Sequence, residues 1–337
     1  MGAHVAPRRF GGARVMSSAP AISVIIPCHQ AAGTLPLQLR ALASQLDVPP
    51  FELLIVDNRS TDGLAAVVVE HRSALLAAGA TAVRLLDAHV ESGASYARNV
   101  GASHASTDFL VFCDADDCVS ARWLADAWAL FEQADAFSGS ALPIPDPEFG
   151  TDISALRDRI APAALPAPEV RHQQELAIPI LMGGDFGMRR SLYLQLGGFD
   201  QALPSAGEDN DLAIRLRAAG RPVLDSYAMR IAYRTRETGR ARRLIARRAA
   251  STHVLLCQRY GVYRSSAFVG RGRLLIATVK LPAAALTMLL KPGPRDLDGF
   301  LARAAGVQGF WTGVLRYRVL RRVPRARLGV GLEESVR

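Results

Sequence analysis

The sequence predicts an α/β protein in which flanking helices cover a doubly wound, mostly parallel sheet. From Ile22 onward, short apolar runs rich in β-branched residues alternate with amphipathic stretches, which is typical of a parallel sheet flanked by helices. The chain has 337 residues, of which 50% are hydrophobic and 21% are charged, so it can bury a full core. No segment repeats at a fixed period, which argues against a solenoid.

Five strands are expected in the first half of the chain, because five runs are short, apolar and followed by a polar or turn residue. They cover residues 22–27, 52–57, 82–87, 108–114 and 136–142. Helices are expected between these strands, because apolar residues recur there at spacings of three and four. They cover residues 34–46, 63–78, 94–105 and 120–133, with Thr34 and Ser120 as the expected N-terminal caps.

The next part of the chain begins with a proline-rich stretch, residues 143–169. We expect this stretch to form a long surface loop that could cover an active site. The sheet pattern resumes at residues 184–190 and leads into a short helix. A further helix is expected to begin near Glu208 and to end at Gly220, where glycine can close the last turn.

Charge divides the chain into two unlike parts. Residues 1–229 hold 17 Lys and Arg against 26 Asp and Glu, a net charge of −9, whereas the remainder holds 23 against 5, a net charge of +18. A basic region of this size suits a polyanionic surface such as anionic lipid headgroups, although a solvated Arg-rich helical face is the plainer alternative. Nucleic acid is not an expected partner, because aromatic residues are not interleaved with the basic ones.

Three regions are expected from these patterns. They are a disordered basic leader over residues 1–20, a catalytic domain over residues 21–229, and a basic helical, membrane-associating region over residues 230–337.

Carboxylates follow the expected strands at the points where those strands end. In an open α/β sheet, ligands bind at the carboxyl ends of the strands. The turn CDADDC, residues 113–118, would hold Asp114, Asp116 and Asp117 close together, and their mutual repulsion favours a bound cation. Oxygen ligands suit Mg²⁺ or Mn²⁺. The alternative is an Asp-rich turn that only begins the next helix.

Five motifs occur in a characteristic order. They are SVIIPCHQAAGTL, LLIVDNRSTDG, ESGASYARNVGASHASTDFLVFCDADD, GGDFGMRRSLYLQLGGFD and GEDNDLAIRL. Together, over residues 22–220, they resemble the inverting GT-A glycosyltransferases of family 2. This resemblance implies a nucleotide-sugar donor, a divalent metal, and an acceptor hydroxyl that is either on a sugar or on a lipid-linked molecule.

The resemblance also implies a donor site. Pro27, Asp57, Gly93, Arg98 and Asp114 match positions that bind the nucleotide, and carboxylates at strand ends can accept hydrogen bonds from a base or a ribose. Backbone N–H groups at the start of a helix and a guanidinium can meet phosphate oxygens. A purely structural role for Arg98 is the alternative.

Metal ligation is implied for two residues of the acidic turn. Asp116 matches the residue that holds the metal bridging the diphosphate, and Asp117 would orient its neighbours or bind a metal-coordinated water.

The pair Glu208 and Asp209 matches the acidic pair of the family, whose aspartate is the expected general base. Asp209 is therefore the expected catalytic residue, and Glu208 and Asp185 are expected to contact the acceptor or the donor sugar. As an alternative, the carboxylates only favour the N-terminus of the following helix through its dipole.

One departure from the family pattern concerns the strand after this helix. Many relatives carry a histidine there, whereas this chain has YRTRETGR from Tyr233. Arg234 and Arg236 are expected to bind the diphosphate directly, because a guanidinium suits phosphate oxygens.

The C-terminal region contains an apolar stretch, residues 274–290, interrupted by Lys280 and Pro282. It is marginal for crossing a bilayer, since about 20 predominantly apolar residues are needed. We expect helices that lie in the membrane interface, with basic residues on anionic headgroups. The protein is thus expected to be cytoplasmic and bound peripherally to the inner face of the cell membrane, with a lipid-linked or cell-envelope acceptor. An ordinary core helix is the alternative.

Two other functions fit parts of the sequence. A nucleotidyltransferase would share the carboxylate-bound metal and the sheet, but it leaves GEDNDL without a role. A catalytically inactive membrane-bound scaffold would not need Asp57, Asp114, Asp116 and Asp209, all of which are present.

Overall fold

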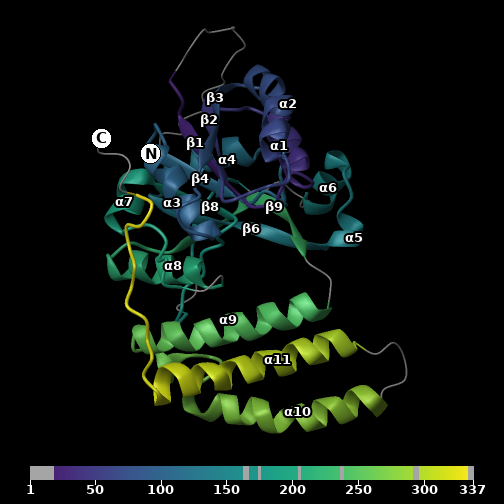
Figure 1. Cartoon of the computed structure of the whole chain (residues 1–337), viewed down its shortest axis with the longest axis vertical. Coiled ribbons are helices and arrows are strands. Elements are labelled where there is room, and N and C mark those ends of the chain that lie inside the picture. The colour runs from purple at the N-terminus through teal and green to yellow at the C-terminus, as the bar shows by residue number, and fades with distance from the viewer. Residues whose placement is uncertain are drawn as a thin grey trace, which may run out of the picture.

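The computed structural model describes residues 19–161, 167–173, 176–203, 206–235, 239–290 and 296–332. The chain forms an α/β part with a layer of three long helices packed beneath it (Figure 1). The leader expected over residues 1–20 lies almost entirely outside the described residues, which begin at Ala19.

A mixed sheet is the frame of the α/β part. Its strand order is β3-β2-β1-β4-β8-β6-β9-β5, with β7 paired to β9. β1, β2, β3 and β4 are parallel to one another, whereas β8 is antiparallel to both β4 and β6. β6 runs parallel to β9, and β5 and β7 are antiparallel to β9. The predicted fold class is confirmed, with antiparallel pairs concentrated in the second half of the sheet.

The strands have the following bounds: β1 Ile22–Cys28, β2 Phe51–Asp57, β3 Ala80–Asp87, β4 Phe109–Cys113, β5 Cys118–Val119, β6 Ala136–Pro145, β7 Arg171–His172, β8 Asp185–Arg189 and β9 Leu224–Thr235. The helices of the α/β part are α1 Leu35–Ala43, α2 Leu64–Ala77, α3 Ala94–His104, α4 Trp123–Phe131, α5 Asp146–Phe149, α6 Ile153–Ile160, α7 Arg190–Gln195 and α8 Glu208–Ala218.

Two local predictions need correction. Ser120 does not cap α4, which begins at Trp123 after Arg122 with no side-chain cap. The proline-rich stretch is not one irregular loop, because β6 continues to Pro145 and is followed by α5 and α6. A proline in the first turn of α5 is compatible with a helix, and the side chain of Asp152 caps α6 by accepting from Ser154 N and Ala155 N.

The central strands are buried on both faces, so their sequences are continuously apolar. In β1, Val24 and Ile26 face one core cluster and Ile25 faces the other; in β2, Ile55 and Leu54 divide in the same way. A parallel sheet covered by helices on both sides requires this pattern. The strand ends, where polar residues begin, are consequently the points at which the sheet can present chemistry.

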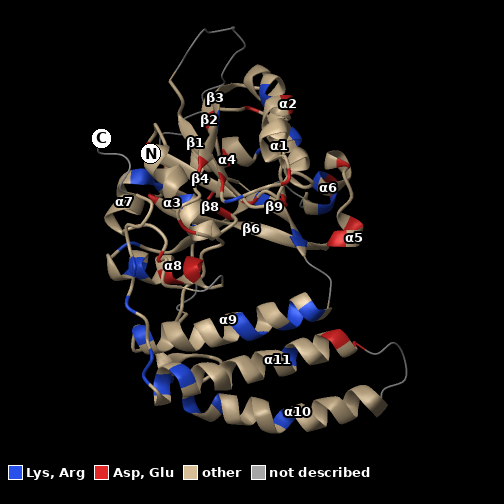
Figure 2. Ribbon diagram, viewed as in Figure 1, with Lys and Arg blue, Asp and Glu red and all other residues tan. Residues whose placement is uncertain are grey.

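The helical layer consists of α9 Gly239–Arg259, α10 Arg273–Leu290 and α11 Leu297–Gly313, with short 3₁₀ turns at Tyr263–Ser265 and Gly270–Gly272 before α10 and a π-helical turn at Val314–Val319 after α11. α11 packs between α9 and α10 (Figure 1). Lys and Arg predominate among the charged residues of the helical layer, whereas most Asp and Glu lie in the α/β part (Figure 2). Since β9 continues to Thr235, the sheet itself extends past residue 229, and the expected domain boundary stays a prediction.

Residues 321–332, which we call the return segment, leave the helical layer and cross back to the α/β part (Figure 1). The backbone of Gly329 donates to Gly197 O at 2.8 Å, and Asn99 Nδ2 donates to Val330 O at 2.8 Å. The helical layer is thus attached to the α/β part both through β9 and through the return segment.

A buried ionic network joins the two parts. Arg259, the last residue of α9, donates to Asp200 Oδ2 at 2.6 Å and lies 3.3 Å from Asp211 Oδ1. Tyr260 donates to the same Asp211 oxygen at 2.6 Å, and the backbone N of Arg327 donates to Asp200 Oδ1 at 2.8 Å. Both aspartates are fully buried, so each would be an uncompensated buried charge without its partners.

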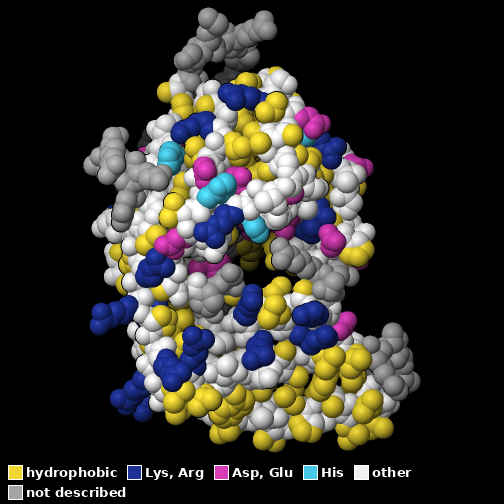
Figure 3. All heavy atoms as spheres, in the orientation of Figure 1, with side chains coloured by type: hydrophobic (Ala, Val, Ile, Leu, Met, Phe, Trp, Pro, Cys, Tyr) yellow, Lys and Arg dark blue, Asp and Glu magenta, His cyan; other side chains and the backbone are white. Residues whose placement is uncertain are grey.

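The outer face of α10 is apolar and exposed. Among the described residues, one helical segment, 263–290, is long and apolar enough to cross a membrane by length and composition, and 6% of its most apolar window is buried. Yellow apolar side chains gather along this edge in Figure 3, below α11. The low burial argues against an ordinary core helix.

We predict that Arg259→Met lowers the free energy of unfolding by about 3–5 kcal/mol, because it leaves the buried carboxylate of Asp200 without its cation, whereas Asp211 keeps Arg215. Urea denaturation measures the change. Arg159→Met is the matched control, since Arg159 pairs with Glu148 on the surface, and its loss is expected to stay within about 1 kcal/mol. Equal losses in the two variants would contradict the structural role of Arg259.

Candidate active site

A cleft of about 770 Å³ opens at the carboxyl ends of β1, β2 and β4. The molecule is visibly hollowed between the α/β part and the helical layer (Figure 3). Seven of the predicted site residues line this cleft: Pro27, Gly93, Arg98, Asp114, Asp116, Glu208 and Arg234. The cleft therefore gathers residues from most of the motifs that the sequence presents separately.

Strand register explains why the first motifs meet. Cys28 is paired with Asp57, and Asp57 with Asp87, so β1, β2 and β3 end at one edge. Cys113 at the end of β4 is paired with Asp185 at the start of the antiparallel β8. All of these chain segments therefore turn at the same side of the sheet.

The turns after β1 and β2 supply lining residues that sequence reasoning missed. His29, Gln30, Asn58 and Arg59 all face the cleft. His29 Nδ1 lies 2.8 Å from Asn58 O, which ties one turn to the other. Gln30 and Arg59 have positive φ values of 52° and 66°, a conformation that marks tight turns. The signal that could have found these residues is their place directly after strand ends.

Asn58 connects the β2 turn to the loop before α3. Its Oδ1 accepts from the backbone N of Gly93 at 2.8 Å, and its Nδ2 donates to Glu91 O at 2.7 Å and to Ala88 O. Gly93 has a φ of 122°, which a residue with a side chain rarely adopts. The predicted position of Gly93 in the cleft is thus set by a buried amide and by glycine's backbone freedom.

Arg98 is the buried cation of the site. It is 4% exposed and donates to Asp114 Oδ1 at 2.6 Å, and its Nε has no hydrogen-bond partner among the described residues. Its guanidinium carbon lies 5.4 Å from the ring centroid of Phe199. Burial acts to lower the pKa of Arg98, but the nearby Asp114, Glu208 and Asp209 outweigh it and raise the pKa.

In the acidic turn between β4 and β5, Asp116 faces the cleft and Asp117 is buried. Asp117 Oδ1 accepts from the backbone N of Arg234 at 2.9 Å, while its buried Oδ2 has no partner among the described residues. Burial, followed by the charges of Asp114 and Asp116, raises the pKa of Asp117 well above its usual value. The turn therefore concentrates negative charge at the cleft wall.

Arg234 lies across this turn. Its Nε donates to Asp116 O at 2.9 Å, another guanidinium nitrogen donates to Asp146 Oδ1 at 2.8 Å, and its guanidinium carbon lies 4.1 Å from the ring centroid of Phe149. The predicted partner Arg236 lies outside the described residues.

The donor set at the turn fits a hard divalent cation. Within the described ranges, no group of three or more His, Cys, Asp or Glu is arranged to hold a metal ion. Mg²⁺ and similar ions usually take only one or two protein carboxylates and complete their shell with water and substrate phosphates. Asp116 on the cleft wall, with the orphaned Oδ2 of Asp117 close by in sequence, satisfies that requirement.

Glu208 and Asp209 form the first turn of α8, after Gly207 with a φ of 87°. Asp209 accepts from its neighbour Asn210 N at 2.7 Å and from Gly183 N at 3.3 Å. Burial raises the pKa of Asp209; burial and then the charge of Asp209 raise that of Glu208. Asp209 itself lines a second cavity of about 390 Å³, next to α9 and α11.

Two consecutive glycines, Gly183 and Gly184, form a turn that both Asp209 and Asp114 adjoin. Gly183 donates to Asp209, and a Cβ on Gly184 would lie 2.5 Å from Asp114 Oδ2. Any side chain at residue 184 would therefore displace the carboxylate that Arg98 holds. The GGD turn is the link between the nucleotide motif and the acidic pair.

Besides Asp117 and Asp209, two further predicted residues among those described are not on the cleft wall. Asp185 is fully buried and accepts from Trp123 Nε1 at 2.8 Å, and burial raises its pKa well above the usual value. Asp57 lies beside the cleft, where its Oδ1 accepts from Ser60 N at 2.8 Å. The sequence therefore locates both carboxylates at the correct edge of the sheet, but it does not reveal which way they point.

Comparison with known proteins identifies relatives over most of the α/β part. The model of the family described as "Glycosyl transferase family 2" matches residues 23–197. An uncharacterized glycosyltransferase of Haemophilus influenzae is 24% identical over 196 residues, which are 58% of this chain and 61% of that protein. The poly(ribitol-phosphate) beta-N-acetylglucosaminyltransferase TarS of Staphylococcus aureus is 32% identical over 113 residues, 33% of this chain and 19% of TarS. The chain thus spans less than two thirds of the length of these relatives.

Solved structures with the same fold include the mannosyltransferase PcManGT of Pyrobaculum calidifontis, with a TM-score of 0.56 and 20% identity over 88% of each chain. TarS residues 1–349 match with a TM-score of 0.50 and 21% identity over 89% of this chain and 92% of that one. At these identities the likeness concerns the fold. With the family match over more than half of its length, the chain belongs to glycosyl transferase family 2 and has the GT-A fold.

Proposed function

We propose that this glycosyltransferase moves a sugar from a nucleoside-diphosphate sugar to an acceptor hydroxyl, with inversion of configuration and with the help of Mg²⁺ or Mn²⁺. The observation that carries the proposal is the convergence of Asp209, Asp114 and Arg98 around the Gly183–Gly184 turn. A donor-binding ion pair and a candidate base thereby adjoin one turn. Family membership favours glycosyl transfer over nucleotidyl transfer.

The donor is proposed to bind in the 770 Å³ cleft, which has the volume of a typical small-molecule site. Pro27, Gly93 and Asp114 would meet the nucleoside, with Asp57 supporting the adjacent turn. PcManGT was solved with GDP-Man and Mn²⁺, and TarS with UDP-GlcNAc. These relatives support a nucleotide sugar as the class of donor.

The diphosphate is proposed to lie against Asp116 and Arg234 on the cleft wall. A divalent metal, when bound by Asp116 with Asp117 behind it, supplies positive charge that stabilises the departing nucleoside diphosphate. Arg234 adds a guanidinium that is already oriented by Asp146 and by the ring of Phe149.

Asp209 is proposed to remove the proton from the acceptor hydroxyl as its oxygen attacks the anomeric carbon. Burial raises the pKa of this carboxylate, which makes it a stronger proton acceptor. Glu208 lines the adjoining cleft and would contact the sugar that is transferred. A single displacement of this kind inverts the anomeric centre.

We predict that Asp209→Asn leaves binding of the nucleotide sugar nearly unchanged but lowers turnover by about 10²- to 10⁴-fold, because an amide cannot accept the proton. Release of UDP or GDP from UDP-GlcNAc and GDP-Man in Mn²⁺ measures turnover. Asp158→Asn, on the exposed face of α6, is the control. Near-normal turnover of the Asp209 variant would show that Asp209 is not the base.

We predict that Asp116→Ala abolishes the Mn²⁺-dependent part of nucleoside diphosphate binding while the fold is retained, because the substitution removes a ligand and also relieves repulsion in the acidic turn. Calorimetric titration with UDP and GDP, with and without Mn²⁺, separates the metal-dependent affinity. If the variant binds nucleotide as tightly as the parent chain in Mn²⁺, the metal assignment is wrong.

The protein is further proposed to bind peripherally to the inner face of the cell membrane. Support comes from the +18 charge after residue 229 and from the exposed side chains of α10, such as Val279 and Leu290, which are 76% and 73% exposed. Arg271 and Arg273 flank the start of this helix. Apolar side chains beside cations suit an interfacial helix on anionic lipid.

We predict that vesicles containing phosphatidylglycerol bind the protein, that high salt weakens this binding, and that Val279→Glu lowers it several-fold. Cosedimentation measures the bound fraction. Val69→Glu is the matched control, since Val69 is 74% exposed on α2 of the α/β part. Equal effects of the two substitutions would contradict the proposed membrane face, and resistance to both salt and alkaline carbonate would indicate a membrane span.

A further inference from the structure

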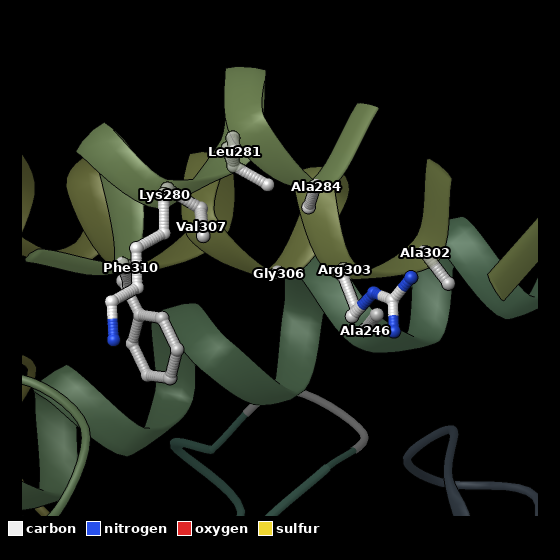
Figure 4. A pocket seen from close by; sticks show the side chains of 10 residues that line it. Ala246, Lys280, Leu281, Ala284, Ala302, Arg303, Gly306, Val307 and Phe310 are labelled. Atoms are coloured by element: carbon white, nitrogen blue, oxygen red, sulfur yellow. The ribbon is translucent and has the colours of Figure 1, made fainter. Parts of the chain in front are cut away.

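A groove of about 550 Å³ runs between α9, α10 and α11. Apart from Lys280 and Arg303, the side chains along it are apolar, and several are alanines (Figure 4). In this view the two cationic side chains lie toward opposite ends of the groove, Lys280 of α10 beside Phe310 and Arg303 of α11 beside Ala246 (Figure 4). The groove thus combines an apolar wall with two cations.

The groove adjoins the cavity that holds Asp209. The two cavities share Ala246 of α9 and Gly306 and Phe310 of α11. The inner cavity, of about 390 Å³, ends at Asp209 and Asn210 at the start of α8. The two adjoining cavities, taken together as one path, therefore extend from the outer helices to the proposed catalytic base.

Gly306 keeps the path open. A Cβ at this position would meet no described atom within 4 Å. The other two glycines of this stretch differ, because a Cβ on Gly309 would lie 2.2 Å from Arg247 O and one on Gly313 would lie 3.0 Å from Ser251 O. Gly309 and Gly313 allow α11 to pack closely on α9, whereas Gly306 leaves free volume between them.

The inner cavity suits a sugar better than a hydrocarbon chain. It offers Asp209 and Asn210 as polar groups, and the rings of Phe268 and Phe310 stack with centroids 5.7 Å apart. Burial lowers the pKa of His253 to about 4, so this side chain is neutral near pH 7 and accepts or donates a hydrogen bond with Ser266 Oγ at 2.8 Å. The outer groove has the opposite character, with apolar walls and two cations.

We propose that this path is the binding site of the acceptor, and that the acceptor is a sugar joined through phosphate to one long hydrocarbon chain. The sugar occupies the inner cavity beside Asp209, the phosphate meets one of the two cations, Lys280 or Arg303, and the chain follows the groove between α10 and α11 toward the outer face of α10. Either cation matches a phosphate, and the small alanine side chains along the groove leave volume for a hydrocarbon chain. The proposal rests on the proposed function, in which Asp209 is the base.

The test uses a geranylgeranyl phosphate that carries a benzophenone at the end of its chain. After irradiation, mass spectrometry is expected to find the label on peptides of α10 and α11 that line the groove. Gly306→Leu is expected to reduce this labelling at least tenfold, because the new side chain fills free volume. Gln308→Leu is the matched control, since Gln308 is exposed on the same helix and lines neither cavity.

Competition identifies the occupant. Unlabelled geranylgeranyl phosphate is expected to suppress labelling, whereas inorganic phosphate and phosphatidylglycerol vesicles are not. If the vesicles suppress labelling equally well, the groove binds bulk lipid and the proposal is wrong. The proposal is also wrong if Gly306→Leu leaves labelling unchanged, or if Gln308→Leu reduces labelling as much as Gly306→Leu does.

Folding and chemistry are controlled separately. Unchanged circular dichroism and unchanged UDP or GDP binding of Gly306→Leu show that the fold and the donor site are intact. Labelling requires no sugar transfer, so the acceptor site is tested independently of the base. If Asp209→Asn keeps its turnover, the proposed function is refuted and the labelling result is unaffected. If labelling fails while nucleotide release is normal, only the proposed acceptor site is refuted.

Discussion

The active site depends on one buried cation. Arg98 lies within a set of carboxylates that come from two separate segments, with Asp114 after β4 and Glu208 and Asp209 at the start of α8. Buried carboxylates without a partner are costly, and their mutual repulsion would drive these segments apart. The guanidinium of Arg98 offsets that repulsion, so the sheet edge and α8 can meet at the Gly183–Gly184 turn.

Much of the fold could be predicted, because its signals are local. The first five predicted strands and the four helices between them agree with the structure to within a few residues, since short apolar runs that end at turn residues are typical of strands in a sheet covered by helices. Caps were less predictable: Ser120 has the right side chain, but the chain turns for two more residues before α4 begins. The prolines near residue 145 mark helix starts as readily as loops.

The candidate site shows where sequence reasoning ends. Motifs place Asp57, Asp114 and Asp185 at the correct edge of the sheet, yet only the packing of Trp123 from α4 decides that Asp185 is buried beneath the cleft. His29 and Asn58 were missed because their role comes from a contact between two turns 29 residues apart. Composition reveals that the C-terminal part is basic and apolar, but not that α9 would form the floor beside Asp209.

The return segment has a mechanical consequence. A helical layer held by a single linker could swing relative to the sheet, which is the usual expectation for loosely joined parts. Here the chain enters the layer after β9 and leaves it through contacts with Gly197, which follows α7, and with Asn99 of α3. Two anchors remove the hinge. The cleft consequently keeps one position and tilt relative to α10. If α10 lies on a membrane as proposed, the cleft stays at a fixed distance from that surface, and only acceptors that extend this far can reach it.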